Sequence, residues 1–252
     1  MDNAPNTPRW DSIREPLREP LARLIEGVQA QLGGHLESVI VVGSALTDDF
    51  RPGVSDINTV IVLDEHTVAA LNAVASLAKS MRRSRLSAPL LMTSSYIERS
   101  RDVFGVEFLD FQLTHQTVLG DDPFAGLRFD KPDVRLQCER EFKATLVRLR
   151  QGWVAVAGDR KLVRDILVST AKGLAPLLRA MLWLKDVERP RTMAATLKEA
   201  SARFLVDLDA AMRADRWRHE KPRLSDADIE STFVAIVAAV DRLAATIDEM
   251  EL

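Results

Sequence analysis

Two short apolar runs separated by a turn-rich segment constrain the fold of this chain more than any other feature. Residues 39–42 form a β-branched run that ends at Gly43-Ser44, and residues 59–63 form a second such run. The turn signal Pro52-Gly53 lies between them. Apolar runs of this length, bounded by glycine and proline, predict buried strands. We therefore expect a strand, a Gly-Ser turn, a loop and a second strand.

Two polar side chains stand at the start of the second run. Asp56 and Asn58 are two residues apart, so on an extended segment their side chains project from the same face. Mg²⁺ binds hard oxygen ligands and usually takes only one or two protein carboxylates when it accompanies substrate phosphates. Both side chains can supply such an oxygen, although Asn58 brings no charge. This pair is typical of a metal-dependent nucleotide site.

The segment resembles the nucleotidyltransferase superfamily with the DNA-polymerase-beta-like fold, in its bacterial small-substrate branch. The family pattern is a strand, a Gly-Ser turn, a loop, and then Asp-x-Asp leading into a strand. Gly43, Ser44 and Asp56 match this pattern, as does the intervening block that contains Leu46-Thr47, Phe50 and Pro52-Gly53. The chain departs from the family at Asn58, which stands in place of the second carboxylate.

The resemblance implies a donor, a cofactor and site residues. The donor would be an NTP, and the cofactor would be Mg²⁺, with Mn²⁺ as a second option. Asp56 would be catalytic and would hold the metal together with Asn58. Gly43 and Ser44 would bind the triphosphate, because glycine permits close approach of the backbone and hydroxyl and N–H groups bind phosphate oxygens.

A third acidic residue is expected from a later strand. Residues 105–111 read as a strand, on which Glu107 and Asp110 would lie on opposite faces. The family pattern, laid on this segment, selects Glu107 as a catalytic residue and third metal ligand. Asp110 would then cap the strand end. The alternative is that both acids are solvated residues at a sheet edge.

The character of the sequence changes near Lys131-Pro132-Asp133. Residues 1–131 read as helices at 18–32 and 67–82 with strands at 39–42, 59–63, 88–92 and around Val106. Residues 132–252 read as helices at 134–157, 160–185, 192–214 and 225–249, and Pro176 is expected to kink or split the second of these. Ser225 and Asp228 have the spacing of a capping box. The predicted fold class is α+β, an N-terminal nucleotidyltransferase-type mixed sheet with flanking helices followed by a C-terminal all-α helical bundle.

Three basic residues of the first C-terminal helix are candidate nucleotide contacts. In relatives with a helical second domain, basic groups of that domain can face the triphosphate, which selects Arg135, Arg140 and Lys143. Ordinary surface pairing explains the same charges, since Glu139 and Lys143 have the i,i+4 spacing of a helical ion pair.

Composition narrows the partners and the compartment. The formal net charge of −3 argues against a general nucleic-acid binder. The single cysteine, Cys138, excludes an internal disulfide and is expected to be a core residue, and His35 and His115 are expected to stand alone. No apolar run long enough to cross a bilayer and no signal sequence are apparent, so we expect a cytoplasmic protein without a membrane partner. The helical bundle could support a homodimer.

Three functions fit these residues. The first is an active nucleotidyltransferase that moves a nucleoside monophosphate from an NTP to a hydroxyl of a small molecule or a protein. The second is a catalytically weakened or inactive nucleotide-binding or interaction module, in which Asn58 marks the loss of the metal site. The third is an antitoxin-like partner protein that acts through its helical surface. We favour the first, because Asp56, Glu107 and the Gly-Ser turn are present together.

Overall fold

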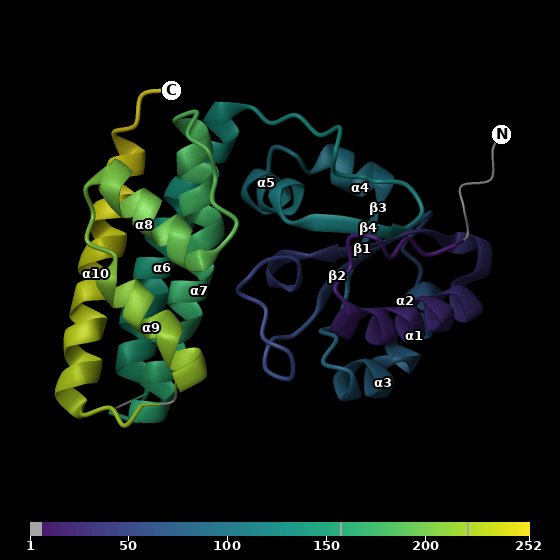
Figure 1. Cartoon of the computed structure of the whole chain (residues 1–252). Coiled ribbons are helices and arrows are strands. Elements are labelled where there is room, and N and C mark those ends of the chain that lie inside the picture. The colour runs from purple at the N-terminus through teal and green to yellow at the C-terminus, as the bar shows by residue number, and fades with distance from the viewer. Residues whose placement is uncertain (1–6, 157, 221) are drawn as a thin grey trace. The chain divides into compact units, whose positions relative to one another are not determined.

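The computed structural model describes residues 7–156, 158–220 and 222–252 (Figure 1). The chain divides into two compact units: unit 1 is Met1–Arg101 with Phe108–Arg128, and unit 2 is Asp102–Glu107 with Phe129–Leu252. Unit 1 contains a four-stranded mixed sheet with flanking helices, and unit 2 is helical. This is the α+β fold class that the sequence predicts.

The sheet of unit 1 has the strand order β3-β2-β1-β4. Its strands are β1 (Leu36–Val42), β2 (Asn58–Leu63), β3 (Leu90–Thr93) and β4 (His115–Leu119). The central strands β1 and β2 are antiparallel, with Val42 opposite Asn58. Strand β4 pairs antiparallel with β1, and β3 pairs parallel with β2. The two strands predicted around the Gly-Ser turn are thus confirmed as neighbours.

Residues 39–42 of β1 and 60–63 of β2 are apolar and buried because the sheet is covered on both faces. Helices α1 (Glu15–Leu32), α2 (Val68–Ser76) and α3 (Ala78–Arg83) lie on one face, and α4 (Ser94–Arg99) and the Phe108–Leu113 part of α5 lie on the other (Figure 1). Leu17, Leu21 and Val28 recur on one side of α1 and join a single buried cluster with Val39 and Val41 of the sheet. This packing fixes the ends of β1 and β2, where the candidate site lies.

The segment predicted as a third acidic strand is a helix, so that prediction was wrong. Helix α5 spans Gly105–Leu113, and the strand that follows it, β4, takes the free edge of β1. The Val106 amide donates to the side chain of Gln137, which satisfies one of the N–H groups left open at a helix start. A short apolar run such as 105–111 does not distinguish a strand from a buried helix by periodicity alone.

Unit 2 is a bundle of helices arranged around α7. Helix α7 (Arg160–Leu184) contacts each of the others: α6 (Lys131–Val156), α8 (Met193–Phe204), α9 (Asp209–Glu220) and α10 (Asp226–Asp248). Pro176 lies inside α7, but the helix is not split there. Contacts with four neighbouring helices outweigh the hydrogen bond that the proline removes. The predicted capping box of Ser225 and Asp228 is confirmed.

The single helix predicted over 192–214 is two helices. Leu205 adopts a left-handed conformation with φ of 53° at the end of α8. The side chain of Asp207 then accepts a hydrogen bond from the Asp209 amide at 2.9 Å, at the start of α9. A capping aspartate is a helix-start signal that the sequence carries at this position.

Helix α7 is the one helix of the described residues that could cross a membrane by length and composition. Its most apolar window is 56% buried within the structure. Leu167, Ala171, Leu174 and Leu178 recur along its buried side, as expected for the central helix of a bundle. Cys138 of α6 is also fully buried, in agreement with its predicted place in the core.

Candidate nucleotide site

The Gly-Ser turn is built by the end of β1. Residues Gly43–Leu46 form a 3-10 turn in which Gly43 has φ of 75°, a left-handed conformation that favours glycine. The Gly43 amide donates to the carbonyl oxygen of Thr114 at 2.8 Å. Ser44 is partly exposed, and its own carbonyl accepts from the Thr47 amide at 3.1 Å. Ser44 therefore lies at the end of β1 on a backbone that is held by the hydrogen bonds of Gly43 and Thr47.

Asp56 and Asn58 share a face of the chain, as predicted. Ile57 and Thr59 are buried, whereas Asp56 is exposed and Asn58 is partly exposed. A Cβ atom built on Gly43 would lie 4.0 Å from Nδ2 of Asn58. The structure thus brings Gly43 and Asn58 together at one end of β1 and β2, with Asp56 two residues before Asn58 in the chain.

The loop before Asp56 is closed by its own hydrogen bonds. The Ser55 and Val54 amides donate to the Arg51 carbonyl at 2.9 and 3.1 Å, and the Arg51 amide donates to the buried Ser55 hydroxyl at 3.1 Å. Gly53 supplies the positive φ of 75° that this turn requires. A closed turn holds Asp56 in a defined position without burying its carboxylate.

Asp56 already has a cationic neighbour. The Arg85 guanidinium lies 3.3 Å from the Asp56 carboxylate and donates to the Val54 carbonyl at 2.5 Å. Two backbone hydrogen bonds join the same segments, from the Ile57 amide to the Arg85 carbonyl at 2.8 Å and from the Ser87 amide to the Ile57 carbonyl at 3.0 Å. The segment that leads into β3 is therefore paired with the segment that leads into β2.

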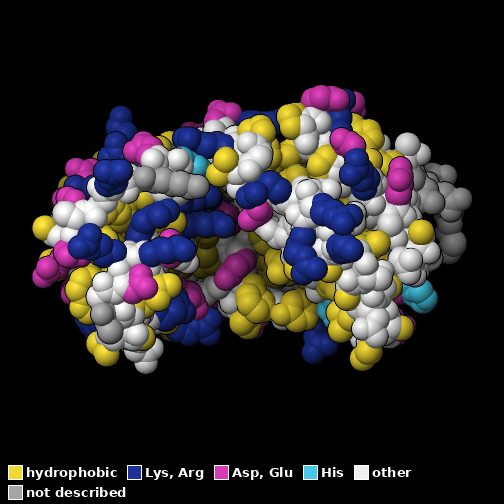
Figure 2. Space-filling model, turned by 90° about the horizontal axis from the view of Figure 1, so that it is seen from below, with side chains coloured by type: hydrophobic (Ala, Val, Ile, Leu, Met, Phe, Trp, Pro, Cys, Tyr) yellow, Lys and Arg dark blue, Asp and Glu magenta, His cyan; other side chains and the backbone are white. Residues whose placement is uncertain are grey.

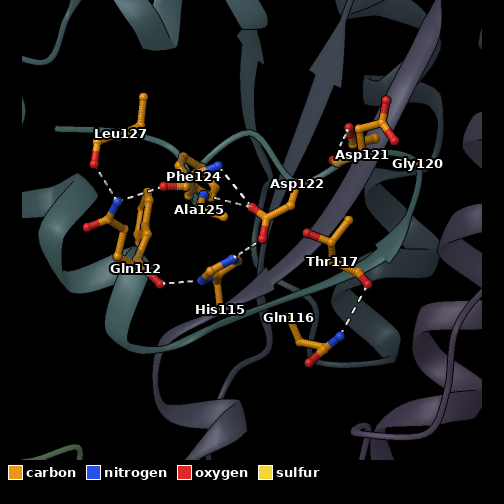
Figure 3. A network of polar contacts seen from close by, with 12 residues as sticks. Gln112, His115, Gln116, Thr117, Gly120, Asp121, Asp122, Phe124, Ala125 and Leu127 are labelled. Atoms are coloured by element: carbon orange, nitrogen blue, oxygen red, sulfur yellow. Dashed lines mark hydrogen bonds and ion pairs between the residues drawn. The ribbon is translucent and has the colours of Figure 1, made fainter.

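A polar network holds the corner between α5 and β4 (Figure 3). His115 Nε2 lies 2.8 Å from the Asp122 carboxylate, and His115 Nδ1 lies 2.8 Å from the Phe111 carbonyl oxygen. The Asp122 carboxylate also accepts from the Phe124 and Ala125 amides. Carbonyl and carboxylate oxygens only accept, so both ring contacts are hydrogen bonds when His115 is an imidazolium. Burial opposes ionisation of Asp122, but the bonds from His115 and the two amides outweigh it and lower the pKa of this carboxyl.

The donor set for a metal is small. Asp56 offers a carboxylate and Asn58 an amide, which fits Mg²⁺ that arrives with a triphosphate and keeps most of its ligands from phosphate and water. The strands on either side of the central pair, β3 and β4, carry no carboxylate. Within residues 7–156, 158–220 and 222–252, no group of three acidic, histidine or cysteine side chains could hold a metal ion.

The fold of the chain is similar to that of a solved structure. No model of a known protein family matches the chain, and no curated protein matches it in sequence. Among solved structures, it is similar to the spectinomycin adenyltransferase AAD(9) from Enterococcus faecialis, solved with ATP and spectinomycin. The TM-score is 0.57 at 10% sequence identity, over 90% of this chain and 98% of that chain.

The chain has a nucleotidyltransferase fold. The likeness confirms the fold that the residues around the Gly-Ser turn predict. The similarity extends over the helical region as well as the sheet, because it covers 90% of this chain.

Glu107 lies on a different element of this nucleotidyltransferase fold than predicted. It belongs to unit 2 and occupies the first turn of α5, where a helix dipole favours a carboxylate. Its carboxylate accepts from Gln137 Nε2 at 2.6 Å. Its role as third acid and metal ligand stays a prediction.

The three basic residues predicted as nucleotide contacts have partners within unit 2. Arg135 pairs with Glu139 at 3.2 Å and donates to the Ile247 carbonyl at 3.0 Å, at the end of α10. Arg140 pairs with Glu141 at 3.4 Å, and Lys143 with Glu139 at 2.5 Å. The bond to Lys143 lowers the pKa of Glu139 and raises that of Lys143. The surface-pairing alternative accounts for these contacts, and nucleotide binding by the three residues stays a prediction.

Unit 2 contains a cavity of about 460 Å³ between α6 and α7. Its polar lining includes the Glu107, Glu141 and Arg148 side chains and the hydroxyls of Thr145 and Ser169. Arg148 lies 3.4 Å from Glu141 and donates to Thr145 at 3.0 Å. The remaining lining is mostly aliphatic, as is typical of small-molecule sites.

The surface charge is mixed on the face drawn in Figure 2, where Lys and Arg side chains are interspersed with Asp and Glu side chains.

Sequence reasoning missed the partners of two histidines and of Asp56. His115 pairs with Asp122, and His35 Nδ1 lies 2.8 Å from the carboxylate of Asp64, which raises the pKa of His35. The pairing of β1 with β2 brings His35 and Asp64 together, whereas His115 and Asp122 are seven residues apart in the chain, on either side of the body of β4. The Arg85 side chain reaches Asp56 because the segment before β3 runs beside Ile57.

Proposed function

We propose that this protein is an Mg²⁺-dependent nucleotidyltransferase that transfers a nucleoside monophosphate from an NTP to a hydroxyl of a small molecule or a protein. The observation that supports this function most is the position of Asn58 beside Gly43 at the end of β1 and β2, two residues after the exposed Asp56. The nucleotidyltransferase fold of the chain supports the same function.

Each residue of the site has a proposed task. Asp56 and Asn58 hold Mg²⁺, which, when bound, neutralises the phosphates and the pyrophosphate that leaves. Gly43 and Ser44 bind phosphate oxygens through the backbone and the hydroxyl. The acceptor oxygen attacks the α-phosphorus, and the bond from that phosphorus to the bridging oxygen breaks. We propose Glu107 as the base that takes the proton of the acceptor hydroxyl.

A small molecule is the favoured acceptor. The cavity of about 460 Å³ in unit 2 has the size and the mixed lining of a small-molecule site. The spectinomycin adenyltransferase of the same fold was solved with ATP and spectinomycin, a small molecule, which supports this class.

A nucleotide-binding module with little or no catalysis is the second candidate. Asn58 removes one charge from the metal site, and neither flanking strand supplies a carboxylate in its place. The Arg85 ion pair also competes with a metal for Asp56. These features would lower the affinity for free Mg²⁺ and do not remove the groups that are proposed to bind the nucleotide.

Calorimetric titration of non-hydrolysable ATP and GTP analogues, with and without Mg²⁺, tests the proposal. We expect binding that needs Mg²⁺ and is lost in Asp56→Asn. The matched control is Asp64→Asn, since Asp64 follows the other end of β2 and pairs with His35. Mg²⁺-dependent binding without nucleotide transfer to any acceptor in a screen would favour the second candidate. Absence of binding at millimolar analogue, or an equal loss in both variants, would reject a nucleotide site at Asp56.

A further inference from the structure

A second cavity lies beside Asp56, within unit 1. It has a volume of about 390 Å³ and is lined by residues of α3, by the segment that leads into β3 and by Asp56. Its charged lining consists of Arg82, Arg85 and Asp56, so it carries one net positive charge. The remaining lining is Ala78, Met81, Leu86, Ser87 and Ala88. A cationic cavity that shares its only carboxylate with a candidate metal site suits an anion that binds together with the metal.

Arg85 is held in place at this cavity by its backbone as well as by its side chain. It has a positive φ of 56°, which is uncommon for a residue with a side chain. Its carbonyl accepts from the Ile57 amide, and its guanidinium reaches both the Val54 carbonyl and Asp56. Strained conformations of this kind persist where surrounding contacts impose them and are common at ligand sites. The result is a guanidinium fixed 3.3 Å from the proposed metal ligand.

Arg82 brings a second guanidinium to the same cavity. It lies in the last turn of α3 and is exposed. No carboxylate in the described part of the chain forms an ion pair with it. The next residue, Arg83, is also exposed in that turn but does not line the cavity. Arg82 and Arg83 thus have the same charge and belong to the same helix, but only Arg82 lines the cavity.

We propose that Arg82 and Arg85 form the subsite for the β- and γ-phosphates of the NTP. This inference rests on the proposed function and assigns the pyrophosphate part of the substrate to these two residues. Guanidinium groups bind phosphate oxygens with paired N–H donors, and the bonds are strengthened by charge. The pyrophosphate carries most of the charge of the substrate and leaves with it, so cationic donors here serve both binding and departure.

Binding at this subsite would exchange the partners of the ion pair between Arg85 and Asp56. With Mg²⁺ and the triphosphate bound, Asp56 would hold the metal and Arg85 would bind the phosphates. Each charge exchanges one partner for another, and none is left unpaired. Free Mg²⁺ has to displace Arg85 without this compensation and binds more weakly.

Titration of inorganic pyrophosphate, AMP and a non-hydrolysable ATP analogue into the full chain tests this subsite. Pyrophosphate and the ATP analogue are titrated in the presence of Mg²⁺, because the metal and the phosphates are proposed to bind together. The variants are Arg82→Gln and its neighbour Arg83→Gln as the matched control, and Arg85→Lys keeps the charge at the more constrained position. Thermal unfolding of each variant checks that the fold is retained.

We expect Arg82→Gln to weaken binding of pyrophosphate and of the ATP analogue about tenfold while AMP binding stays unchanged. Arg83→Gln should bind all three ligands like the wild type. Arg85→Lys should lose affinity for pyrophosphate, because lysine lacks the paired donors.

Three outcomes would overturn the subsite: no pyrophosphate binding by the wild type at millimolar ligand, equal effects of Arg82→Gln and Arg83→Gln, or an equal loss for AMP, which would place the arginines at the α-phosphate or at an acceptor phosphate. Failure of the proposed function is distinct from these. Arg82-dependent pyrophosphate binding in a protein that transfers no nucleotide would support the subsite and reject the transferase. Nucleotide transfer by Arg82→Gln with unchanged affinity for the ATP analogue would support the transferase and reject the subsite.

Discussion

The carbonyl oxygen of Thr114 accepts the amide hydrogen of Gly43 at 2.8 Å, and this bond ties the turn of the candidate site to the corner between α5 and β4. The corner is in turn held by His115, which pairs with Val42 in the sheet and with Asp122 through its ring. The position of the Gly-Ser turn therefore depends on a histidine and an aspartate that contact no proposed ligand.

The variant Asp122→Ala should loosen this turn. It removes the partner of His115 and the acceptor for the Phe124 and Ala125 amides. Loss of a partly buried, charged hydrogen-bond acceptor costs about 1–2 kcal/mol in the free energy of unfolding. Urea unfolding measures that loss, and hydrogen exchange should show faster exchange of the Gly43 amide. The control is Asp121→Ala at the exposed neighbouring residue, which should change neither the free energy of unfolding nor the exchange of the Gly43 amide. Slowed or unchanged exchange of that amide in Asp122→Ala would show that Asp122 does not hold the Gly-Ser turn.

The same carboxyl predicts a dependence of stability on pH. The folded protein lowers the pKa of Asp122 from its ordinary 3.8. A group with a lowered folded pKa stabilises the fold above its unfolded pKa and loses that contribution as the pH falls through the folded value. The stability difference between wild type and Asp122→Asn should therefore shrink as the pH falls below about 4. Urea unfolding at a series of pH values measures it, and a difference that grows on acidification would contradict the assignment.

Gly120 should tolerate no side chain. It has φ of 75°, and a Cβ atom there would lie 1.9 Å from the Glu37 carbonyl oxygen. Gly120→Ala should lower the free energy of unfolding by about 3 kcal/mol or more, because backbone has to move. Gly126 is the matched control, since a Cβ atom there meets nothing within 4 Å. Thermal unfolding compares the two variants, and equal melting temperatures would show that the β4 end adapts at little cost.

The predictable part of this fold was local in sequence. The runs at 39–42 and 59–63 are strands because their residues are apolar on both faces, and a short turn-rich loop leaves them as neighbours. The spacing of Asp56 and Asn58 placed them on one face for the same local reason. The capping box at Ser225 is also contained within four residues.

The unpredictable part depends on contacts between distant segments. Residues 105–111 have the apolar content of a strand, and they form a helix because β4 occupies the edge of β1 and Gln137 caps the helix start. The Arg85 and Asp56 pair exists because the segment before β3 runs beside Ile57. A local sequence pattern shows neither which strand pairs with the edge of a sheet nor which distant side chains come into contact.

The variant Glu107→Gln tests whether Glu107 acts as the catalytic base or only stabilises the start of α5. The amide can still accept from Gln137, so the start of α5 keeps its contact and the fold should be retained. If Glu107 is the base, kcat for nucleotide transfer should fall by about a hundredfold or more with little change in KM for the NTP. Glu141→Gln changes the same charge in the same cavity and should affect the KM for the acceptor instead. Equal, small effects of both variants on kcat would reject the assignment of Glu107.

Restoring a carboxylate at residue 58 tests whether the remaining site is intact. Asn58→Asp places a second charge beside Asp56 and the Gly-Ser turn, where a bound Mg²⁺ would be attracted more strongly. We expect Mg²⁺ to bind about tenfold more tightly in the presence of the ATP analogue, or about 1.4 kcal/mol. Asn72→Asp on α2, an exposed position, is the control for added charge and should leave the affinity unchanged. Transfer activity that rises with the affinity would mean that only Asn58 limits catalysis. Tighter Mg²⁺ binding without activity would mean that the metal site survives while the base has been lost, and unchanged Mg²⁺ affinity would exclude a metal at Asp56.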